Sequence, residues 1–146
     1  MVRMVYIYPE IGTIGYNFDN GDFNADGISD LLINMETNDE QNIGRAYLIF
    51  GSEDNLNTDI NITDLNGVNG VELLGETAND HTGVQVRNAG DFNGDGIEDF
   101  LISSELSEVD GVTDVGRSVL IFGHLGGWLA TEDVFNLPVG ESIIKY

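Results

Sequence analysis

Hydrophobic residues in this chain gather in short continuous runs that polar, glycine-rich stretches separate. The clearest runs cover residues 31–33, 47–50, 100–102 and 119–122. They are too short for helices and rich in β-branched and aromatic residues, so they favour strands and we expect almost no helix. Because the runs are continuously apolar instead of alternating, they predict sheets that are buried on both faces.

The same order of strands and loops occurs twice along the chain. Asp22 corresponds to Asp91, 69 positions later, and Phe50 corresponds to Phe122, 72 positions later. Repeats of this length that contain several short strands are typical of propeller blades. Each unit is predicted to be a four-stranded antiparallel meander, with strands at 16–19, 29–34, 46–50 and 71–74 in the first unit and at 83–88, 98–103, 118–122 and 142–145 in the second.

These strands predict an all-β fold of two four-stranded antiparallel β-propeller blades with an extra N-terminal strand. Residues 12–76 are assigned to the first blade and 77–146 to the second. Residues 1–11 are expected to contain an additional outer strand at 2–8, which is either left over, with no blade of its own to complete, or swapped. Two blades cannot close a ring, so we expect the chain to form homo-oligomers or to be part of a longer propeller.

An acid-rich loop with the pattern Gly-Asp-Phe-Asn-x-Asp-Gly-x-x-Asp joins the first two predicted strands of each unit. Side-chain oxygens stand at loop positions one, three, five and nine, glycine stands at six, and the apolar residue at seven can offer its backbone carbonyl. This spacing suits a hard cation that takes six to eight oxygens, usually Ca²⁺. The alternative is two acidic turns without an ion, in which the clustered carboxylates would repel one another.

Two other calcium-binding families share a loop of this kind. An EF-hand needs a bidentate glutamate at loop position twelve and flanking helices, but Ile33 and Ile102 stand there, inside predicted strands. Dockerin modules also follow the loop with helices, and they space its copies more closely than 69 residues. The loops therefore indicate calcium sites within a β fold.

The loop, the apolar strand after it and a later Gly-Arg-x-x-x-Ile-Phe-Gly segment resemble the FG-GAP repeat of integrin α-subunit propellers and many bacterial surface proteins. The resemblance extends from about residue 12 to the end, and the Phe-Gly of the family name stands at residues 50–51 and 122–123. The Gly-Ala-Pro half is missing, since residues 34–36 and 103–105 differ from it. The resemblance therefore favours a distant, microbial relative over an integrin α-subunit.

The resemblance implies structural calcium at one face of the propeller and a binding surface at the opposite face. Loops at 35–42, 76–82 and 105–114 would form that surface and take a protein or glycan ligand. The implied ligands are Asp22, Asn24, Asp26, Asp30 and the Ile28 carbonyl for one ion, and Asp91, Asn93, Asp95, Asp99 and the Ile97 carbonyl for the other.

The chain is strongly acidic, with 26 Asp and Glu against 5 Lys and Arg and a net charge of −21. This charge repels nucleic acid and anionic lipid, so we expect no nucleic-acid partner and instead cations or basic protein surfaces. Cysteine is absent and no apolar run reaches membrane-spanning length, so neither a disulfide nor a membrane span is predicted. Because extracellular calcium modules bind their ions weakly, the loops favour a location outside the cell or at its surface.

The usual motifs of nucleophilic and zinc catalysis are missing. The sequence has no Gly-x-Ser-x-Gly turn and no His-Glu-x-x-His helix, so we expect no enzyme activity. His81 beside Asp80 is the candidate for a catalytic or metal-binding pair. An accessory part of a calcium-dependent hydrolase or lyase stays open as an alternative.

Several further side chains have both a structural and a functional interpretation. Arg45 and Arg117 occupy equivalent places, and we expect each to pair with a carboxylate of its own blade. Trp128 is expected to pack in the core or between blades, the alternative being a platform on which sugar stacks. Phe23 and Phe92 lie inside the calcium loops and are expected to anchor them by packing inward.

The predicted function is binding without a chemical step. Calcium would cancel the clustered Asp charge, fix the loops and hold the loops of the opposite face in register. The chain would then be a calcium-binding FG-GAP β-propeller module for protein recognition or cell-surface adhesion. A carbohydrate-binding, lectin-like propeller is the alternative, with Trp128 and loop carboxylates as the sugar site.

Overall fold

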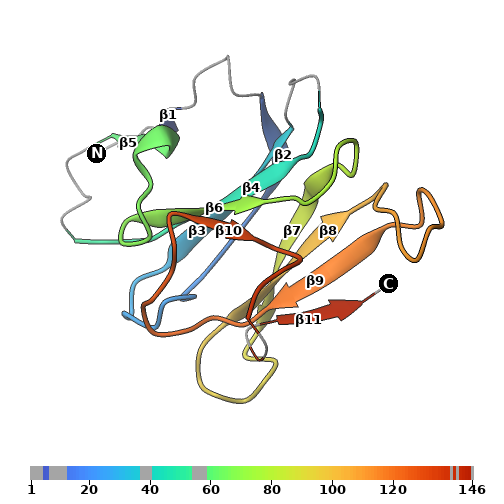
Figure 1. Ribbon diagram of the computed structural model, residues 1–146. Coiled ribbons are helices and arrows are strands. Elements are labelled where there is room, and N and C mark those ends of the chain that lie inside the picture. Colours follow the sequence, from blue (N-terminus) through green and yellow to red (C-terminus); the bar gives the residue numbers. More distant parts are fainter. Residues whose placement is uncertain are drawn as a thin grey trace.

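Two β-sheets that pack against each other make up most of this computed structural model (Figure 1). The structure describes residues 5–6, 13–36, 41–53, 59–138, 140 and 142–145. The fold is all-β, as the hydrophobic runs predict. Among the described residues the one helical element is the single 3₁₀ turn η2 (Ile62–Asp64).

The first sheet has five strands in the order β10-β6-β4-β3-β2. Four of them form an antiparallel meander: β2 (Thr13–Gly21), β3 (Asp30–Glu36), β4 (Arg45–Ile49) and β6 (Gly70–Leu74). The fifth, β10 (Thr131–Asp133), pairs in parallel with β6 at the edge of the sheet. Because β10 comes from the predicted second unit, the first sheet is built from both units.

The second sheet has four antiparallel strands in the order β11-β9-β8-β7. They are β7 (Thr82–Gly90), β8 (Asp99–Ser104), β9 (Arg117–Ile121) and β11 (Ser142–Lys145). Each of the eight strands predicted from the sequence overlaps one of the meander strands of the two sheets. The prediction of strand positions is therefore confirmed, whereas β10 was not predicted.

One face of the first sheet packs against the second sheet, whose strand β7 contacts β2, β3 and β4. Successive side chains of a strand point to opposite faces, so Leu32 and Leu48, which are paired across β3 and β4, point toward the second sheet. They belong to one fully buried cluster with Phe100 and Val119 of the second sheet. This shared core holds the two sheets together.

The other face of the first sheet is covered by a connecting segment. The strand β5 (Ile60–Asn61) and the turn η2 lie over it, and Ile62 is 4% exposed there. Beneath this segment lies a second apolar cluster that consists of Ile33, Met35, Tyr47 and Ile49 with Ile62. Burial on both faces is confirmed for this sheet, but the outer cover is the short strand β5 with one turn of helix and not a four-stranded sheet.

The second sheet is less completely covered. Leu101 points away from the first sheet and is 36% exposed. On the same face Ser103 and Ser118 are hydrogen-bonded through their hydroxyl groups at 2.9 Å. The prediction of full burial on both faces, made from the run at 100–102, is therefore wrong at Leu101.

The strand β1 (Val5–Tyr6) lies apart from the two sheets and pairs in parallel with β5. The predicted N-terminal strand at 2–8 is confirmed at these two residues. The other residues of 1–11 lie outside the described part of the chain. β1 thus lies beside the segment that covers the first sheet.

Candidate metal centre

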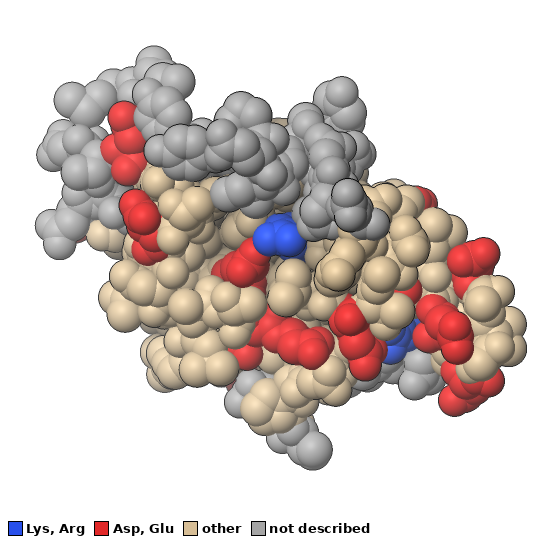
Figure 2. Space-filling view, turned by 45° about the horizontal axis from the view of Figure 1, so that its top comes forward, with Lys and Arg blue, Asp and Glu red and all other residues tan. Residues whose placement is uncertain are grey.

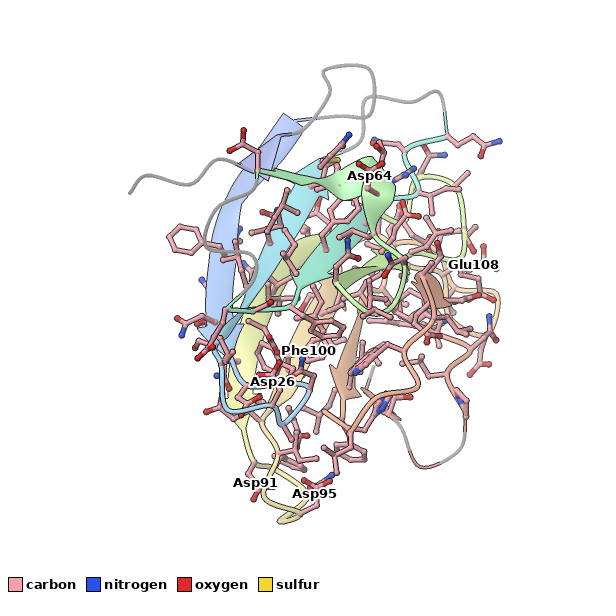
Figure 3. The ribbon with its side chains drawn as sticks, turned by 90° about the vertical axis from the view of Figure 1, so that its left-hand side faces the viewer. Asp26, Asp64, Asp91, Asp95, Phe100 and Glu108 are labelled. Atoms are coloured by element: carbon pink, nitrogen blue, oxygen red, sulfur yellow. The ribbon has the colours of Figure 1, made fainter. Side chains whose placement is uncertain are left out.

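The two acid-rich loops lie at the same end of the molecule. The first joins β2 to β3 and the second joins β7 to β8, each between the first two strands of its sheet. In Figure 3 Asp26, Asp91 and Asp95 lie at this end, whereas Asp64 and Glu108 lie toward the other end. The loops therefore connect strands, as predicted, and not the helices of an EF-hand.

Side chains at positions one and three of the first loop accept hydrogen bonds from a single backbone amide, and the side chain at position five accepts one from another amide. The Asp26 amide donates to Asp22 Oδ1 at 3.1 Å and to Asn24 Oδ1 at 3.0 Å. The Gly27 amide donates to Asp22 Oδ2, and the Ile28 amide donates to Asp26 Oδ1. These bonds turn the three polar side chains toward the inside of the loop.

The second loop repeats these four hydrogen bonds and adds two, from the Gly94 amide to Asp91 Oδ1 and from the Asn93 amide to Asp99 Oδ2. The Asp95 amide donates to Asp91 Oδ1 at 3.0 Å and to Asn93 Oδ1 at 2.9 Å. The Gly96 and Ile97 amides donate to Asp91 Oδ2 and Asp95 Oδ1, at 2.9 and 2.8 Å. Two segments 69 residues apart thus place the same donors and acceptors in the same positions.

The carboxylates at position nine make contacts of another kind. Asp30 is 2% exposed and accepts hydrogen bonds from the amides of Phe23 and Gly51, at 2.8 and 2.9 Å. Asp99 is fully buried and accepts from the amides of Phe92 and Gly123, at 2.8 and 3.0 Å. Each carboxylate therefore ties the start of its loop to the end of the third strand of its sheet.

Burial raises the pKa of the Asp30 carboxyl to about 6, because removal from water disfavours the charged form. The amides of Gly51 and Phe23 oppose this increase by donating to the carboxylate. The negative charges of Asp26 and Asp22 add to it. The first loop thus concentrates negative charge around a poorly solvated carboxylate, which is an environment that a bound cation would relieve.

The glycine of each Phe-Gly pair lies directly against the backbone at the end of its loop. A Cβ atom on Gly51 would collide with the carbonyl oxygen of Ser29, and one on Gly123 would collide with that of Glu98. Only glycine allows this approach without a shift of the backbone, and the approach brings each glycine amide to its position-nine carboxylate. The Phe-Gly pair is part of the resemblance to the FG-GAP repeat. Its glycine has the physical role of allowing this close approach of two backbone segments.

The predicted ligands suit calcium in kind, since all of them offer carboxylate, amide or carbonyl oxygens. Two carboxylates and one amide group converge inside each loop, whereas the position-nine carboxylates are bonded to backbone amides. Across the described residues, no group of three or more His, Cys, Asp or Glu side chains lies close enough together to hold a metal ion. The two complete ligand sets therefore stay predictions.

Hydrogen bonds join the first loop to the second sheet. The Asp22 amide donates to Glu98 Oε2 at 2.8 Å, and Asn88 Nδ2 donates to the same oxygen at 3.2 Å. The His124 amide donates to the Phe23 carbonyl oxygen at 3.1 Å. Glu98 belongs to the second loop, so the two loops are mechanically coupled.

The phenylalanines at loop position two differ in their surroundings. Phe23 is fully buried and contacts the ring of Phe100, whereas Phe92 is 65% exposed. Inward packing is thus confirmed for Phe23 and wrong for Phe92. The physical reason is that the first loop lies beside a neighbouring sheet, and no described part of the chain covers the second loop in that way.

The loops that were predicted to form the binding face meet at the other end of the molecule. The Asn79 amide donates to the Gln41 carbonyl oxygen at 2.7 Å, and the Leu106 amide donates to that of Asp80 at 3.2 Å. These contacts join described parts of 35–42, 76–82 and 105–114. Residues 37–40 of the first of these loops lie outside the described part of the chain.

His81 and Asp80 are adjacent in sequence but take different partners. The His81 ring lies 2.8 Å from Asn42 Nδ2 and 3.1 Å from Glu105 Oε1. The Asp80 carboxylate accepts from the Ser107 hydroxyl at 3.2 Å and lies 3.5 Å from the Arg117 guanidinium. Both residues therefore help to hold the three loops together, which is a structural use of the candidate pair.

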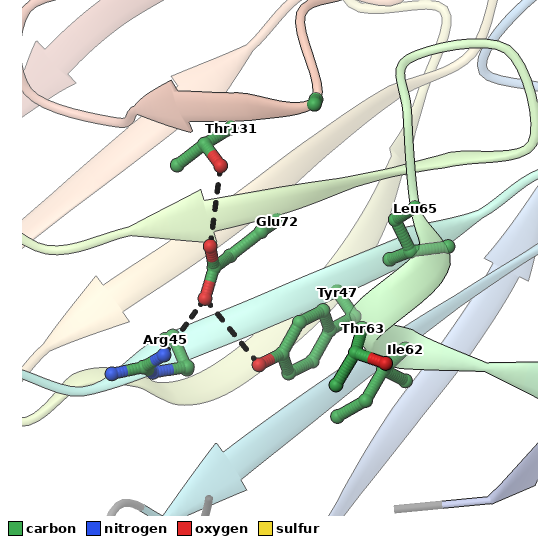
Figure 4. Close-up of a pocket in the computed structure, with 8 residues that line it drawn as sticks. Arg45, Tyr47, Ile62, Thr63, Leu65, Glu72 and Thr131 are labelled. Atoms are coloured by element: carbon green, nitrogen blue, oxygen red, sulfur yellow. Dashed lines mark hydrogen bonds and ion pairs between the residues drawn. The ribbon is translucent and has the colours of Figure 1, made fainter.

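Both equivalent arginines form ion pairs, as predicted. Arg45 lies 2.8 Å from Glu72 of its own sheet, at one side of a cavity of about 220 Å³ (Figure 4). Arg117 of the second sheet lies 3.2 Å from Glu76 and stacks on the Phe135 ring at 3.9 Å. Pairing within one unit is confirmed for both arginines, since Arg117 also lies 3.5 Å from Asp80 of its own unit, and Glu76 adds a partner from the end of the first unit.

Burial raises the pKa of the Tyr47 hydroxyl in this cavity to about 12, and the charge of Glu72 adds to the effect. The hydroxyl donates to Glu72 Oε1 at 3.4 Å, and the Thr131 hydroxyl donates to Oε2 at 3.2 Å. The carboxylate of Glu72 thus connects β4, β6 and β10.

Trp128 packs in the core shared by the two sheets. It is 7% exposed, and its ring stacks on that of His124 with centroids 4.0 Å apart. Its indole nitrogen donates to the His124 carbonyl oxygen at 3.2 Å. The core interpretation is confirmed, and Trp128 presents no open ring face on which a sugar could stack.

On the face shown in Figure 2, acidic side chains are spread among the other described residues, with two small basic areas between them. None of the helical segments in the described part of the chain has the length and apolar character needed to cross a membrane. No family model matches the chain, and no curated protein matches it significantly. The resemblance to the FG-GAP repeat therefore depends on the loop and Phe-Gly residues alone.

Proposed function

We propose that this chain is a calcium-binding module of the FG-GAP type, whose two sheets are propeller blades and whose function is protein recognition at a cell surface or outside the cell. The observation that carries the proposal is the recurrence of the same hydrogen bonds, from the amides at loop positions five, six and seven, in two acid-rich loops 69 residues apart. Acidic turns that bind no ion would not be expected to orient the equivalent side-chain oxygens in the same way in two separate loops.

Each loop would hold one ion by the residues at positions one, three, five, seven and nine. Bound calcium would supply positive charge that compensates the clustered carboxylates. The converging oxygens of Asp22 and Asn24, and of Asp91 and Asn93, would contact it with little rearrangement. Asp30 and Asp99 would have to share their oxygens between the ion and the backbone amides that they already accept from, which a carboxylate can do because it has about four acceptor sites.

Calcium would stabilise the folded state by mass action. At a free concentration of about one hundred times Kd, each independent site contributes about 2.7 kcal/mol. The two loops are coupled through Glu98, which belongs to the second loop and accepts a hydrogen bond from the amide of Asp22 in the first. Occupation of either site would therefore stiffen this whole end of the molecule.

Recognition would use the other end, where three connecting loops meet over a buried polar cluster. Ser104 donates to the Asp80 carbonyl oxygen at 2.7 Å, and Ser107 donates to Ser104 at 2.6 Å. A fixed base of this kind lets exposed loops present side chains without a large loss of entropy on binding. The acidic composition favours a partner with a basic surface.

Titration calorimetry of calcium chloride into metal-free protein tests the proposal. We expect two sites in the wild type, one in Asp26→Ala and one in Asp95→Ala. Asp64→Ala, which changes an acidic residue at the far end of the molecule, should keep both sites. Absence of binding, or binding that neither loop variant reduces, would contradict the assignment.

The recognition face has a separate test. Hydrogen exchange of the amides in 76–82 and 105–114 should slow when calcium is added, because the strands that carry these loops are fixed at their other ends by the sites. Amides of 62–64, which lie outside both loops and both sheets, serve as the internal control. Equal exchange rates with and without calcium in these loops would contradict the proposed effect of calcium on the recognition face.

A further inference from the structure

One side chain of the second loop, Glu98 at loop position eight, holds the start of the first loop. Glu98 Oε2 accepts hydrogen bonds from the Asp22 amide at 2.8 Å and from Asn88 Nδ2 at 3.2 Å. A hydrogen bond to a carboxylate is stronger than one between two neutral groups. Asp22 stands at position one of the first loop, so the second loop fixes the backbone of a predicted ligand of the first ion.

Asn88 keeps this carboxylate in place from the strand that precedes the second loop. Its Nδ2 also donates to the Asn20 carbonyl oxygen at 2.7 Å, and its backbone amide donates to Asp19 Oδ2 at 3.0 Å. Asp19 and Asn20 belong to the end of β2, directly before the first loop. Glu98 is therefore positioned by contacts with both units.

The glycine at position 21 makes room for this contact. A Cβ atom on Gly21 would collide with Glu98 Oε2 and would lie 2.7 Å from Asn88 Nδ2. Gly21 has no positive φ, whereas its counterpart Gly90 has a φ of 67° and no atom within 4 Å of a built Cβ. Glycine at 21 therefore has a packing reason, which is the approach of Glu98, and glycine at 90 has a conformational one.

The equivalent residue of the first loop is bonded inside its own unit. Ser29 stands at position eight there, and its hydroxyl accepts a hydrogen bond from Asn20 Nδ2 at 3.2 Å. The calcium motif leaves position eight open, so Glu98 is not one of the predicted ligands. The two loops are thus joined by a group that only the second loop contains.

We infer that the two loops bind calcium cooperatively and that Glu98 is the positioning residue that couples them, an inference that rests on the proposed calcium sites. Glu98 lies between the Ile97 carbonyl and the Asp99 carboxylate, which are predicted ligands of the second ion. An ion held there would fix residue 98 from both sides and, through it, the amide of Asp22. The first loop would then lose less freedom on binding its own ion, and the coupling acts equally in the other direction.

Repulsion between the two ions is too weak to reverse this sign. Each loop offers three carboxylates against the two positive charges of one calcium ion, so an occupied loop carries no net positive charge. They are Asp22, Asp26 and Asp30 in the first loop and Asp91, Asp95 and Asp99 in the second. Salt further screens exposed charges beyond about 8 Å at 0.15 M ionic strength. Positive cooperativity is therefore the expected result.

Calorimetric titration of calcium chloride into metal-free protein measures the coupling. After statistical correction, we expect the second ion to bind the wild type at least about fivefold more tightly than the first, at the lower end of the usual range. Glu98→Ala should abolish this difference. Glu98→Gln, which loses the charge but keeps an acceptor oxygen, should retain part of it. Ser29→Ala, at the same position of the first loop, is the matched control and should behave as the wild type.

Hydrogen exchange of the Asp22 amide gives a readout that a general loss of stability would not change. In Asp26→Ala only the second loop can bind, and calcium should slow the exchange of this amide by a factor similar to the coupling. The same variant with Glu98→Ala added should show no such effect. The Thr63 amide, in η2, is the internal control for global stabilisation.

Three results would overturn the coupling. They are independent sites in the wild type, cooperativity that persists in Glu98→Ala, and an equal loss in Glu98→Ala and Glu98→Gln, which would show an effect of charge alone. In each of these cases calcium still binds, so the proposed sites stand. Absence of calcium binding would instead contradict the sites and the coupling together, which keeps the two failures distinguishable.

Discussion

The ring of Phe23 packs edge-on against the ring of Phe100, with centroids 5.0 Å apart and planes inclined at 67°. Phe23 belongs to the loop of the first sheet and Phe100 to a strand of the second, so the contact joins one predicted calcium site to the core between the sheets. The second loop has the same residue at the same position, but Phe92 lies in solvent. The two phenylalanines thus form a matched pair for measuring what this contact contributes.

Phe23→Ala should lower the free energy of unfolding by about 3–5 kcal/mol, because it leaves a cavity in a closed core. Phe92→Ala should change it by less than about 0.5 kcal/mol, as an exposed residue without buried contacts. Urea unfolding followed by Trp128 fluorescence measures both. Equal effects of the two substitutions would contradict the observed burial of Phe23.

Loop position four has a left-handed backbone in both loops, with φ of 58° at Ala25 and 80° at Gly94. This conformation costs a residue with a side chain roughly 1–2 kcal/mol. Gly94→Ala should therefore destabilise the protein by about 1 kcal/mol, whereas Ala25→Gly should be neutral or slightly stabilising. No atom lies within 4 Å of a Cβ built on Gly94, so the effect is one of backbone conformation and not of packing. Thermal unfolding of the two variants beside the wild type checks it, and a Gly94→Ala variant as stable as the wild type would refute the conformational argument.

The strands of the two meanders could be predicted because local sequence determines them. Runs such as 31–33 and 100–102 are apolar, and turn-forming residues end them. β10 was missed because Thr131, Glu132 and Asp133 have no apolar residue and no alternation, so that only pairing with β6 makes them a strand. The strand propensity of these residues does not predict such a contact, because the contact depends on the tertiary arrangement of the rest of the chain.

The predicted ligand positions were read from spacing, and spacing alone does not distinguish their roles. Asp30 and Asp26 look alike in the motif, but Asp30 is bound to the amide of Gly51, 21 positions later. The recurrence of a Phe-Gly pair after each loop, with its glycine 21 positions beyond Asp30 and 24 beyond Asp99, was the available signal for this contact. No feature of the sequence indicates that Phe92 is exposed, because Phe23, the same residue type at the equivalent position of the first loop, is buried.

The phenol of Tyr47 should ionise at about pH 12, against about 10 for an ordinary tyrosine. Because its pKa is raised by folding, the neutral form is the one that the folded state favours, and the unfolded chain loses this proton first. The stability that Tyr47 contributes is therefore fully present below pH 10 and is lost as the pH rises from 10 to 12.

The difference in ultraviolet absorbance between the wild type and Tyr47→Phe gives this midpoint directly, since the other four tyrosines are common to both. Circular dichroism in parallel reports whether the fold persists through the titration. A midpoint near 10 in the folded protein would mean that the hydroxyl is solvated, contrary to the contact with Glu72.

The last prediction separates the two kinds of carboxylate within one loop. Asp99→Ala removes the acceptor of the Phe92 and Gly123 amides, and a buried donor left without a partner costs about 1–3 kcal/mol. We therefore expect a loss of that size with calcium present and also with a chelator. Asp95 is exposed and bonded within its own loop, so Asp95→Ala should lower the free energy of unfolding in calcium and have little effect on it in chelator. Urea unfolding of both variants under the two conditions measures the four values. If Asp95→Ala were equally destabilising in chelator, the Asp95 carboxylate would stabilise the loop without calcium. If Asp99→Ala were destabilising only in calcium, Asp99 would act mainly as a calcium ligand and its hydrogen bonds to backbone amides would contribute little.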